Sequence, residues 1–532
     1  MHYTVSYLSY ESTGLFSNLV TDYLNNDEKV KSLYLHRPNL KGIEEAIKIN
    51  SESNTDRALL VSALKKQYES IQSSELVIKN IDSLLNGNVF TICTAHQPNI
   101  FTGHLYFIYK IIHAIKLAEE LNHAIPENRF VPIYYMGSED ADLDELGEIF
   151  IKGKTYKWAT QQKGAFGRMK IDQSLLAMMN ELERQLSIEP FGLKIINKIK
   201  SIYTEGKTIE QATFEFVHDL FGEYGLVVLL PDNKNLKALF ANIAKKELTE
   251  QFSYQCVQET IKTIPNQYKV QVAGRDINLF YLKDDFRERI EWNNDKYEIV
   301  NTAITFTHDE ILQELENYPE RFSPNVILRP LFQEMILPNI AFIGGGGELA
   351  YWMELKNVFD KATIPYPVLI LRNSFSIVDE KTSDLIKKLG LYEADFFESA
   401  TAIHEKLVKK NSTHHLELSN AKQSLHLLYN DIKAAASTID VTLGDHAGAM
   451  YVKSLRRIES LEKKMIKAEK RKYEDELRQI CKIKVALFPN HILQERVDNF
   501  LPYYAKWGDD FIPAIYKSSK GLEQEFCIMS TA

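Results

Sequence analysis

Apolar positions along the chain follow two periods, and their alternation predicts the fold of the central part. Short, continuous apolar runs of the kind buried in parallel sheets occur at residues 89–93, 130–135, 226–230, 326–328 and 367–371. Helical spacing separates them, for example at 106–121 and 209–221. Strands that alternate with helices in this way predict a doubly wound α/β core.

Other parts of the chain depart from this alternation. Residues 1–85 have helical spacing and few turn signals, so we expect a helical N-terminal segment that packs on the core. The core occupies 86–234 and resumes at 321–378. Residues 235–320 are expected to be an inserted connecting region, with charged helices and a strand-rich patch near 268–282.

Residues 379–482 are rich in helix formers and charged residues and poor in glycine and proline. They contain two apolar stripes at spacings of three and four: Leu425, Leu428, Ile432, Ala435 and Ile439, then Tyr451, Leu455, Ile458, Leu461 and Met465. This pattern predicts two helices paired as a coiled-coil arm with a turn at Gly444-Asp445, and core helices of a bundle are the alternative. Residues 483–532 are expected to return to the core.

Composition narrows the class of protein. A chain of 532 residues with 45% hydrophobic content has room for two to four domains. The net charge of −9 does not favour nucleic-acid binding. The four cysteines lie far apart, without metal-ligand spacing, and no leader or membrane-spanning run is apparent. We therefore expect a cytoplasmic protein with no metal site of its own and no membrane contact.

The first candidate site is the strand-to-helix turn in residues 94–110, T-A-H-Q-P-N-I-F-T-G-H-L-Y-F-I-Y-K. Backbone N–H groups and the positive end of a helix dipole converge at such turns, which bind phosphates. His96 and His104 are candidate catalytic residues, because imidazoles stabilise developing negative charge. Thr94, Gln97, Thr102 and Gly103 are expected to contact the ligand. A capped helix start with a solvated histidine is the alternative.

A second candidate follows the strand at 130–135, where M-G-S-E-D-A-D-L-D-E places five carboxylates close together. Such a density of acids calls for a cation, such as magnesium or a substrate ammonium. Asp140 is a candidate catalytic residue, and Glu139 and Asp142 are candidate binding residues. Capping of the next helix would also explain some of these acids.

The third candidate is the glycine run Gly344, Gly345, Gly346 and Gly347, between an apolar strand and a helix. It fits neither a Walker A loop nor G-x-G-x-x-G. We expect a mobile loop whose N–H groups wrap an oxyanion or a phosphate. The residues expected to bind ligand beside it or at other strand ends and loops are Arg168, Asn325, Arg329, Gln333, Glu348, Tyr351 and Arg372.

These motifs, together with L-F-P-N-H-I-L-Q-E-R at 487–496, resemble in order the BshC family of bacillithiol biosynthesis. Residues 101–104 also resemble a relaxed H-x-G-H signature of adenylyl transferases. The resemblance implies a Rossmann-like core, a coiled-coil arm that forms a homodimer, and a cysteine ligase that joins L-cysteine to glucosaminyl malate. ATP with Mg²⁺ would activate cysteine as an adenylate.

In that scheme the histidines stabilise the triphosphate. Glu139, Asp140 or Asp142 holds the cysteine ammonium or magnesium, and Arg329 and Arg372 bind the malate carboxylates. Two other functions stay open: a nucleotidyltransferase on a small molecule, and a non-catalytic coiled-coil scaffold with a vestigial nucleotide fold.

Overall fold

The computed structural model describes residues 2–414 and 416–531. The chain forms two compact units. Unit 1 comprises Met1–Ser376 and Gln494–Met529, and unit 2 comprises Ile377–Leu493 with Ser530–Ala532. Within the described residues, no helix combines the length and apolar character needed to cross a membrane.

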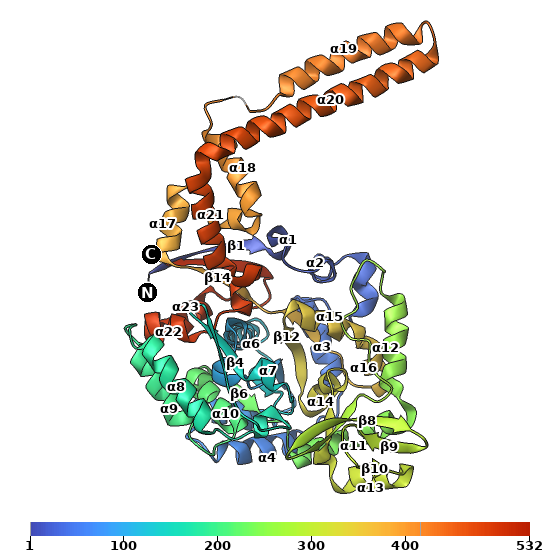
Figure 1. Ribbon diagram of the computed structural model, residues 1–532. Coiled ribbons are helices and arrows are strands. Elements are labelled where there is room, and N and C mark those ends of the chain that lie inside the picture. Colours follow the sequence, from blue (N-terminus) through green and yellow to red (C-terminus); the bar gives the residue numbers. More distant parts are fainter. Residues whose placement is uncertain (1, 415, 532) are drawn as a thin grey trace. The chain divides into compact units, whose positions relative to one another are not determined.

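The core of unit 1 is a five-stranded parallel sheet in the order β13-β12-β2-β3-β6 (Figure 1). Its strands are β2 (Val89–His96), β3 (Arg129–Met136), β6 (Val227–Leu229), β12 (Asn339–Gly344) and β13 (Val368–Leu371). Four of them coincide with predicted apolar runs, and the fifth, β12, is the strand predicted before the glycines. Almost every residue of these strands is buried, which is why they read as continuous apolar runs.

The strand expected at 326–328 was wrong. Leu328 begins helix α14 (Leu328–Ile336), and the short strand β11 (Phe322–Pro324) precedes it. The Asn325 side chain accepts the N–H of Ile327 at 2.9 Å and so favours a turn into the helix. Pro330 lies in the first helical turn, where no N–H is needed for an intrahelical bond.

Helix α6 (Leu105–Ala124) is the long helix that follows β2, and it packs on one face of the sheet. Ala114, Leu117 and Leu121 meet Phe90 and other strand side chains in a continuous apolar core. Helix α3 (Leu40–Ser51) contributes Ile43 and Ala46 to the same core. The start of α6 is therefore fixed at the carboxyl end of β2.

The segments around the core complete unit 1. The first 85 residues are mostly helical, as expected, but begin with strand β1 (Tyr3–Ser9) in a small sheet ordered β1-β15-β14 with β14 (Ser374–Val378) and β15 (Glu525–Thr531). The helices that follow β1 are α1 (Tyr10–Thr13), α2 (Asn18–Leu24), α3, α4 (Arg57–Tyr68) and α5 (Glu75–Ser83). The elements between β3 and β6 are α7 (Leu143–Leu146), β4 (Glu148–Ile151), β5 (Lys154–Lys157), α8 (Gln173–Leu186), α9 (Gly192–Ile202) and α10 (Ile209–Phe221).

The inserted region is partly strand, but later in the chain than expected. Its antiparallel sheet has the order β10-β9-β8-β7-β11, and β7 begins only at Leu279. The other elements are α11 (Lys234–Glu250), α12 (Phe252–Thr263), β7 (Leu279–Lys283), β8 (Phe286–Asn293), β9 (Lys296–Ile299), β10 (Thr305–Phe306) and α13 (His308–Asn317). Helices α15 (Gly346–Glu354) and α16 (Lys356–Ala362) then connect β12 to β13, and α22 (Leu501–Trp507) and α23 (Phe511–Ser518) precede β15.

Unit 2 is helical and contains a long hairpin of α19 (Ser419–Ser437) and α20 (Val441–Lys470), seen in orange in Figure 1. Tyr429 and Ser454 meet across it with their hydroxyl oxygens 2.9 Å apart, and Lys422 pairs with Glu462 at 2.6 Å. The remaining helices are α17 (Glu380–Lys388), α18 (Ala400–Asn411) and α21 (Glu474–Leu487).

The turn predicted at Gly444-Asp445 was wrong, because both residues lie inside α20. The hairpin turns earlier, and Asp440 caps α20 by accepting the N–H of Thr442 at 2.8 Å. A β-carbon on Gly444 would lie 2.1 Å from the Ser437 hydroxyl oxygen. The glycine is therefore explained by the close approach of the two helices.

Candidate functional site

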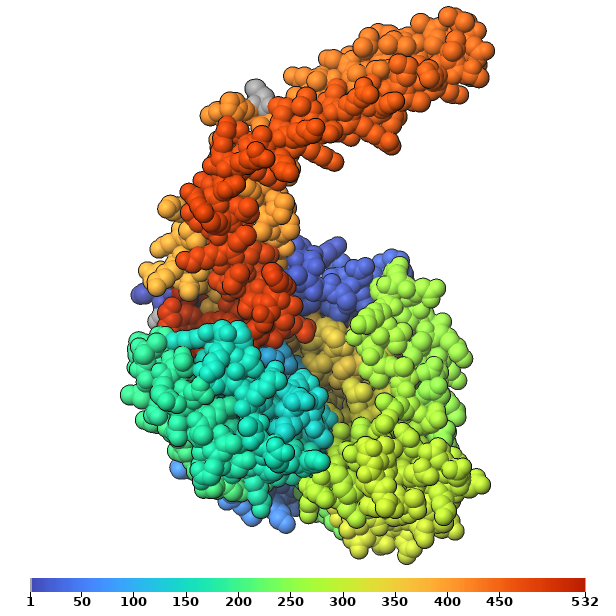
Figure 2. Space-filling model, viewed as in Figure 1, coloured from blue at the N-terminus to red at the C-terminus, as the bar shows by residue number. Residues whose placement is uncertain are grey.

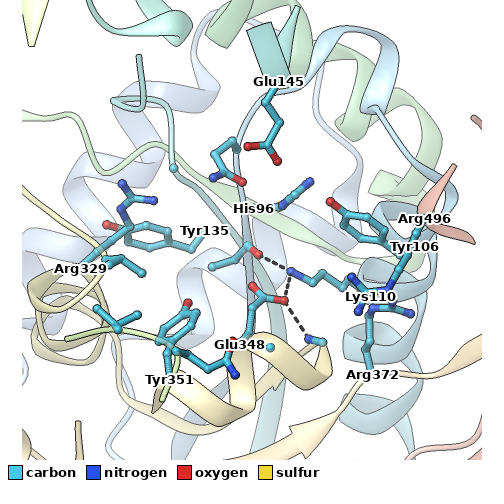
Figure 3. Close-up of a pocket in the computed structure, with 18 residues that line it drawn as sticks. His96, Tyr106, Lys110, Tyr135, Glu145, Arg329, Glu348, Tyr351, Arg372 and Arg496 are labelled. Carbon is cyan, nitrogen blue, oxygen red and sulfur yellow. Dashed lines mark hydrogen bonds and ion pairs between the residues drawn. The ribbon is translucent and has the colours of Figure 1, made fainter. Parts of the chain in front are cut away.

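A cavity of about 420 Å³ opens in unit 1 at the carboxyl ends of the parallel strands (Figure 3). Ligands of open α/β sheets bind at this edge. Figure 2 shows the face of unit 1 hollowed between its teal segments and its green and gold segments. The cavity is lined by Ala95, His96, Gln97, Tyr106, Lys110, Tyr135, Gly137, Glu145, Gln271, Val272, Val326, Arg329, Gly345, Gly347, Glu348, Tyr351, Arg372 and Arg496.

The three predicted motifs meet here, each at a strand end. His96 ends β2 and Gln97 follows it, and the backbone N–H of Gly137, after β3, donates to the His96 carbonyl at 2.8 Å. The N–H of Arg372, after β13, donates to the carbonyl of Gly344 at 2.8 Å. Parallel register therefore brings into one cavity residues that are more than 270 positions apart in the chain.

His96 presents a neutral imidazole to the cavity. Burial lowers its pKa far below the usual value, and the neighbouring Lys110 charge acts in the same direction. Its Nε2 atom has no hydrogen-bond partner among the described residues, and the ring meets that of Tyr106 edge-on at 5.3 Å between centroids. A neutral imidazole can hydrogen-bond a ligand, and the lowered pKa makes this ring a weak base.

Lys110 lies at the inner wall of the cavity, on α6. Its side chain is only 2% exposed, and Nζ is 2.5 Å from a Glu348 carboxylate oxygen and donates to the Ala95 carbonyl at 3.0 Å. Burial lowers the pKa of Lys110, while Glu348 favours its charged form. Glu348 also accepts the N–H of Gly345 at 2.8 Å, so the pair is tied to the start of α15.

The glycine run is not the mobile loop that we expected. Gly344 ends β12, Gly345 is the N-cap of α15, and Gly346 and Gly347 are its first residues. A β-carbon on Gly347 would meet nothing within 4 Å, so the helix start is open toward the cavity. N–H groups at a helix start lack intrahelical partners, and together with the helix dipole they attract anions.

Two arginines of the cavity are held by internal carboxylates. Arg329 donates to Asp140 at 2.9 Å, and Gln97 donates to the same carboxylate at 2.9 Å. Burial disfavours the ionised form of Asp140, but the charge and hydrogen bonds of Arg329 outweigh this effect and hold the pKa of Asp140 well below its usual value. Arg372 pairs with Glu495 at 2.7 Å, and its guanidinium lies 5.1 Å from the Tyr106 ring centre.

None of the three predicted acids lines the cavity, and Asp140 is the one that holds the lining residue Arg329. Glu139 is buried in an ion pair with Lys237. Asp142 caps the short helix α7 by accepting the N–H of Glu145 at 3.1 Å. Each of these acids therefore has its own role in the fold: Asp140 pairs with an arginine, Glu139 pairs with a lysine, and Asp142 caps a helix. No group of three or more His, Cys, Asp and Glu side chains is placed to hold a metal ion among the described residues.

Further predicted residues have structural partners away from the cavity. The Thr94 hydroxyl donates to the Ile343 carbonyl at 2.8 Å, and Arg168 pairs with Asp232 at 2.8 Å. The Asn325 amide donates to Asn278 at 2.8 Å, and the Gln333 amide donates to Glu334 at 2.8 Å. Gly345 and Gly347 line the cavity, whereas their neighbours Gly344 and Gly346 do not.

The turn at residues 101–104 also lies outside the cavity. Phe101, Thr102 and Gly103 have positive φ values of 48°, 70° and 63°, a conformation that favours glycine. The Asn499 amide donates to the carbonyls of Phe101, at 3.0 Å, and Gly103. His104 is the N-cap of α6, and its Nδ1 is 3.2 Å from the Val497 carbonyl. This turn anchors the C-terminal segment to the core.

Sequence reasoning missed several lining residues: Tyr106, Lys110, Tyr135, Glu145, Gln271, Val272, Val326 and Arg496. Lys110 had a signal, because a lysine inside the apolar run F-I-Y-K-I-I must be buried with a partner. Arg496 ends the motif at 487–496 that carries part of the resemblance, but neither this motif nor the return of the C-terminal segment to the core identifies which side chain reaches the site.

The fold and the site define a Rossmann-like α/β protein with a helical hairpin and a cavity whose lining includes four basic side chains. Two family models match the chain: the N-terminal Rossmann-like domain of bacillithiol biosynthesis BshC over residues 3–373, and the C-terminal coiled-coil domain over 375–531. The chain belongs to the BshC family. The expected Rossmann-like core and coiled-coil domain are confirmed.

Relatives match the chain over nearly its full length. A Flavobacterium johnsoniae protein is 39% identical over 525 residues, which cover 98% of this chain and 99% of the relative. A Christiangramia forsetii protein is 38% identical and covers 98% of both chains. A Bacillus cytotoxicus protein is 26% identical over 94% of this chain and 96% of its own. Each carries the name "Putative cysteine ligase BshC".

Proposed function

We propose that this protein is a cysteine ligase that joins the carboxyl group of L-cysteine to the amine of glucosaminyl malate, with ATP as the activator. The relatives' shared name supports the class of reaction. The observation that carries the proposal is one cavity that combines an open helix start, a buried lysine and a neutral imidazole with a free nitrogen. Each of these groups meets a requirement of amide formation through an adenylate.

The N–H groups at the start of α15 face the cavity beside Lys110, which makes this wall suitable for the phosphates of ATP. The cysteine carboxylate attacks the α-phosphorus, a P–O bond forms, and pyrophosphate leaves. Negative charge grows on the phosphate oxygens in this step, where fixed donors stabilise it most. Mg²⁺ would enter with the nucleotide, bound through phosphate oxygens and water.

Amide formation then needs a base. The neutral amine attacks the carbonyl carbon of the cysteinyl adenylate, the new C–N bond forms, and the C–O bond to AMP breaks. The nitrogen loses a proton, which a phosphate oxygen of the departing AMP accepts, while the neutral ring of His96, whose charged form burial disfavours, orients the amine through a hydrogen bond. Tyr106, Tyr135 and Tyr351 line the remaining wall and offer faces on which a sugar ring can pack.

The reaction is tested by incubating the protein with L-cysteine, glucosaminyl malate and ATP with Mg²⁺, followed by mass spectrometry. We expect an amide product together with AMP and pyrophosphate. Lys110→Met should abolish product, whereas Lys116→Met should leave activity intact, because Lys116 lies on the same helix but outside the cavity, half-buried beside Glu119, Glu120 and the Tyr516 ring. A stable nucleotide adduct without amide would instead indicate a nucleotidyltransferase, and no product at all would contradict the ligase.

The helical hairpin supports a second part of the proposal, assembly as a homodimer through α19 and α20. Large apolar side chains are exposed along both helices, and Leu428 is 55% and Ile432 is 43% exposed. Others are Leu427, Ile439, Val441, Leu443, Met450, Val452 and Leu461. Extended exposed apolar surface marks interaction sites, and a second identical hairpin would cover it.

Light scattering after size-exclusion chromatography tests the dimer. Wild-type protein should elute with twice the chain mass, and Leu428→Lys combined with Ile432→Lys should give a monomer with unchanged helix content. The exposed Arg457→Glu, on α20, is the matched control for a change of charge and should leave the dimer intact. A monomeric wild-type protein would contradict this part of the proposal.

A further inference from the structure

Four of the side chains that line the cavity carry a positive charge, and three of them are already neutralised. Lys110 pairs with Glu348, Arg329 with Asp140 and Arg372 with Glu495. Arg496 differs, because its guanidinium makes no hydrogen bond or ion pair with any residue that the structure describes. It is solvent-exposed, and Figure 3 shows it beside Tyr106, on the same side of the cavity as Lys110 and Arg372.

The backbone that carries Arg496 is fixed on both sides. Glu495, before it, is fully buried and accepts hydrogen bonds from Arg372, Ser374 and the N–H of Phe375. After it, the carbonyl of Asp498 accepts the N–H of Leu105 at 2.7 Å. A flexible side chain on an anchored backbone loses less freedom when it binds a ligand than one on a mobile loop.

Arg329 and Arg372, which were expected to bind the malate carboxylates, are unlike Arg496 in this respect. A ligand anion that approaches either of them competes with a buried carboxylate already in place. A guanidinium without a partner offers its full charge and a planar pair of N–H donors suited to carboxylate and phosphate. Arg496 is therefore the cation of this cavity best placed to bind an incoming anion.

We infer that Arg496 is a substrate-binding residue that pairs with an anionic group of a substrate at the mouth of the cavity. The inference rests on the proposed function, which supplies two sources of such oxyanions: the malyl carboxylates of the amino-sugar substrate and the phosphates of ATP. L-cysteine carries one carboxylate and one ammonium, so its binding should depend least on Arg496. The three substrates thus separate the possible partners.

Isothermal titration of the full chain with each substrate alone tests the inference. Arg496→Gln should weaken binding of glucosaminyl malate or of ATP about 10- to 100-fold, the range for loss of a charge-assisted hydrogen-bond pair. The affinity of Arg496→Lys should lie between those of wild type and Arg496→Gln, since lysine keeps the charge and loses the planar geometry. The affinity that falls identifies the oxyanion. Arg184→Gln, at an exposed arginine of α8, should bind all three substrates as wild type does.

Unchanged affinity of Arg496→Gln for both anionic substrates would overturn the inference, provided that circular dichroism shows the wild-type fold. Salt dependence supplies an independent reading, because wild-type affinity should fall more steeply with ionic strength than that of the variant. If wild-type protein binds neither glucosaminyl malate nor ATP, the proposed function fails. In that case malate and pyrophosphate replace them as probes, and equal binding by wild type and variant overturns the inference.

Discussion

The ion pair of Arg372 and Glu495 gives the sharpest test of how the cavity is built. Both side chains are almost inaccessible to solvent, at 3% and 0%. Glu495 accepts hydrogen bonds from the Arg372 guanidinium at 2.7 Å, the Ser374 hydroxyl at 3.2 Å and the Phe375 N–H at 3.2 Å. Burial disfavours the charge on Arg372, but Glu495 outweighs it and raises the pKa of the guanidinium. Arg372 is charged with or without its partner, and Glu495 is the group that compensates this buried charge.

Glu495→Gln keeps the shape of the side chain and removes its charge. Breaking one side of a buried ion pair costs about 3–5 kcal/mol, because the other charge stays buried without compensation. The glutamine oxygen can keep at most two of the three hydrogen bonds, those from Arg372 and Ser374, while its amide group then faces the N–H donor of Phe375. We therefore expect a loss of about 3–5 kcal/mol in the free energy of unfolding of unit 1.

Urea unfolding followed by tryptophan fluorescence measures this loss in the right part of the chain. All four tryptophans, at positions 158, 292, 352 and 507, belong to unit 1. Arg372→Met and the double variant complete a thermodynamic cycle, and the double variant should be more stable than the sum of the single losses predicts. A loss below about 1 kcal/mol for Glu495→Gln, within the range of surface pairs, would refute the reasoning.

Three further variants test other parts of unit 1. Burial raises the pKa of Glu334 to about 8 from 4.5, so the folded state binds more protons and stability falls as pH rises between these values. Glu334→Gln should flatten that fall in urea unfolding at pH 5 and pH 8, and equal slopes would contradict the assignment. Gly344→Ala should lower the melting temperature, because its β-carbon would lie 2.7 Å from the Phe342 ring. Gly347→Ala, with open space around it, should melt like wild type but bind ATP more weakly, and unchanged ATP affinity would argue against phosphate at the start of α15.

Much of the core was predictable because the burial of a strand on both faces determines the residue types within that short stretch of sequence. Strands buried on both faces need apolar residues at every position, and so β2, β3, β6 and β13 read directly as apolar runs. The strand expected at 326–328 failed because an asparagine side chain turned the backbone into a helix. The turn predicted at Gly444 was wrong because glycine occurs both in turns and where two helices pack closely, and the local sequence does not distinguish the two.

The site was predictable to the level of segments, but less well for side chains. The turn after β2, the loop after β3 and the glycines were each predicted as candidate sites. The predicted residues that line the one cavity where these segments meet are His96, Gln97, Gly345, Gly347, Glu348, Tyr351, Arg329 and Arg372. Which acids face the ligand depended on long-range partners. Asp140 is held by Arg329 and Glu139 by Lys237, residues about 190 and 100 positions away. No local pattern encodes such pairings.

The central claim is that one cavity at the strand ends holds both the amino-sugar acid and the nucleotide. A crystal structure of the protein with glucosaminyl malate and a non-hydrolysable ATP analogue tests it most directly. We predict phosphates at the start of α15 near Lys110, with the sugar amine within reach of His96. Density for either ligand only on another surface, with the cavity filled by solvent, would contradict the account.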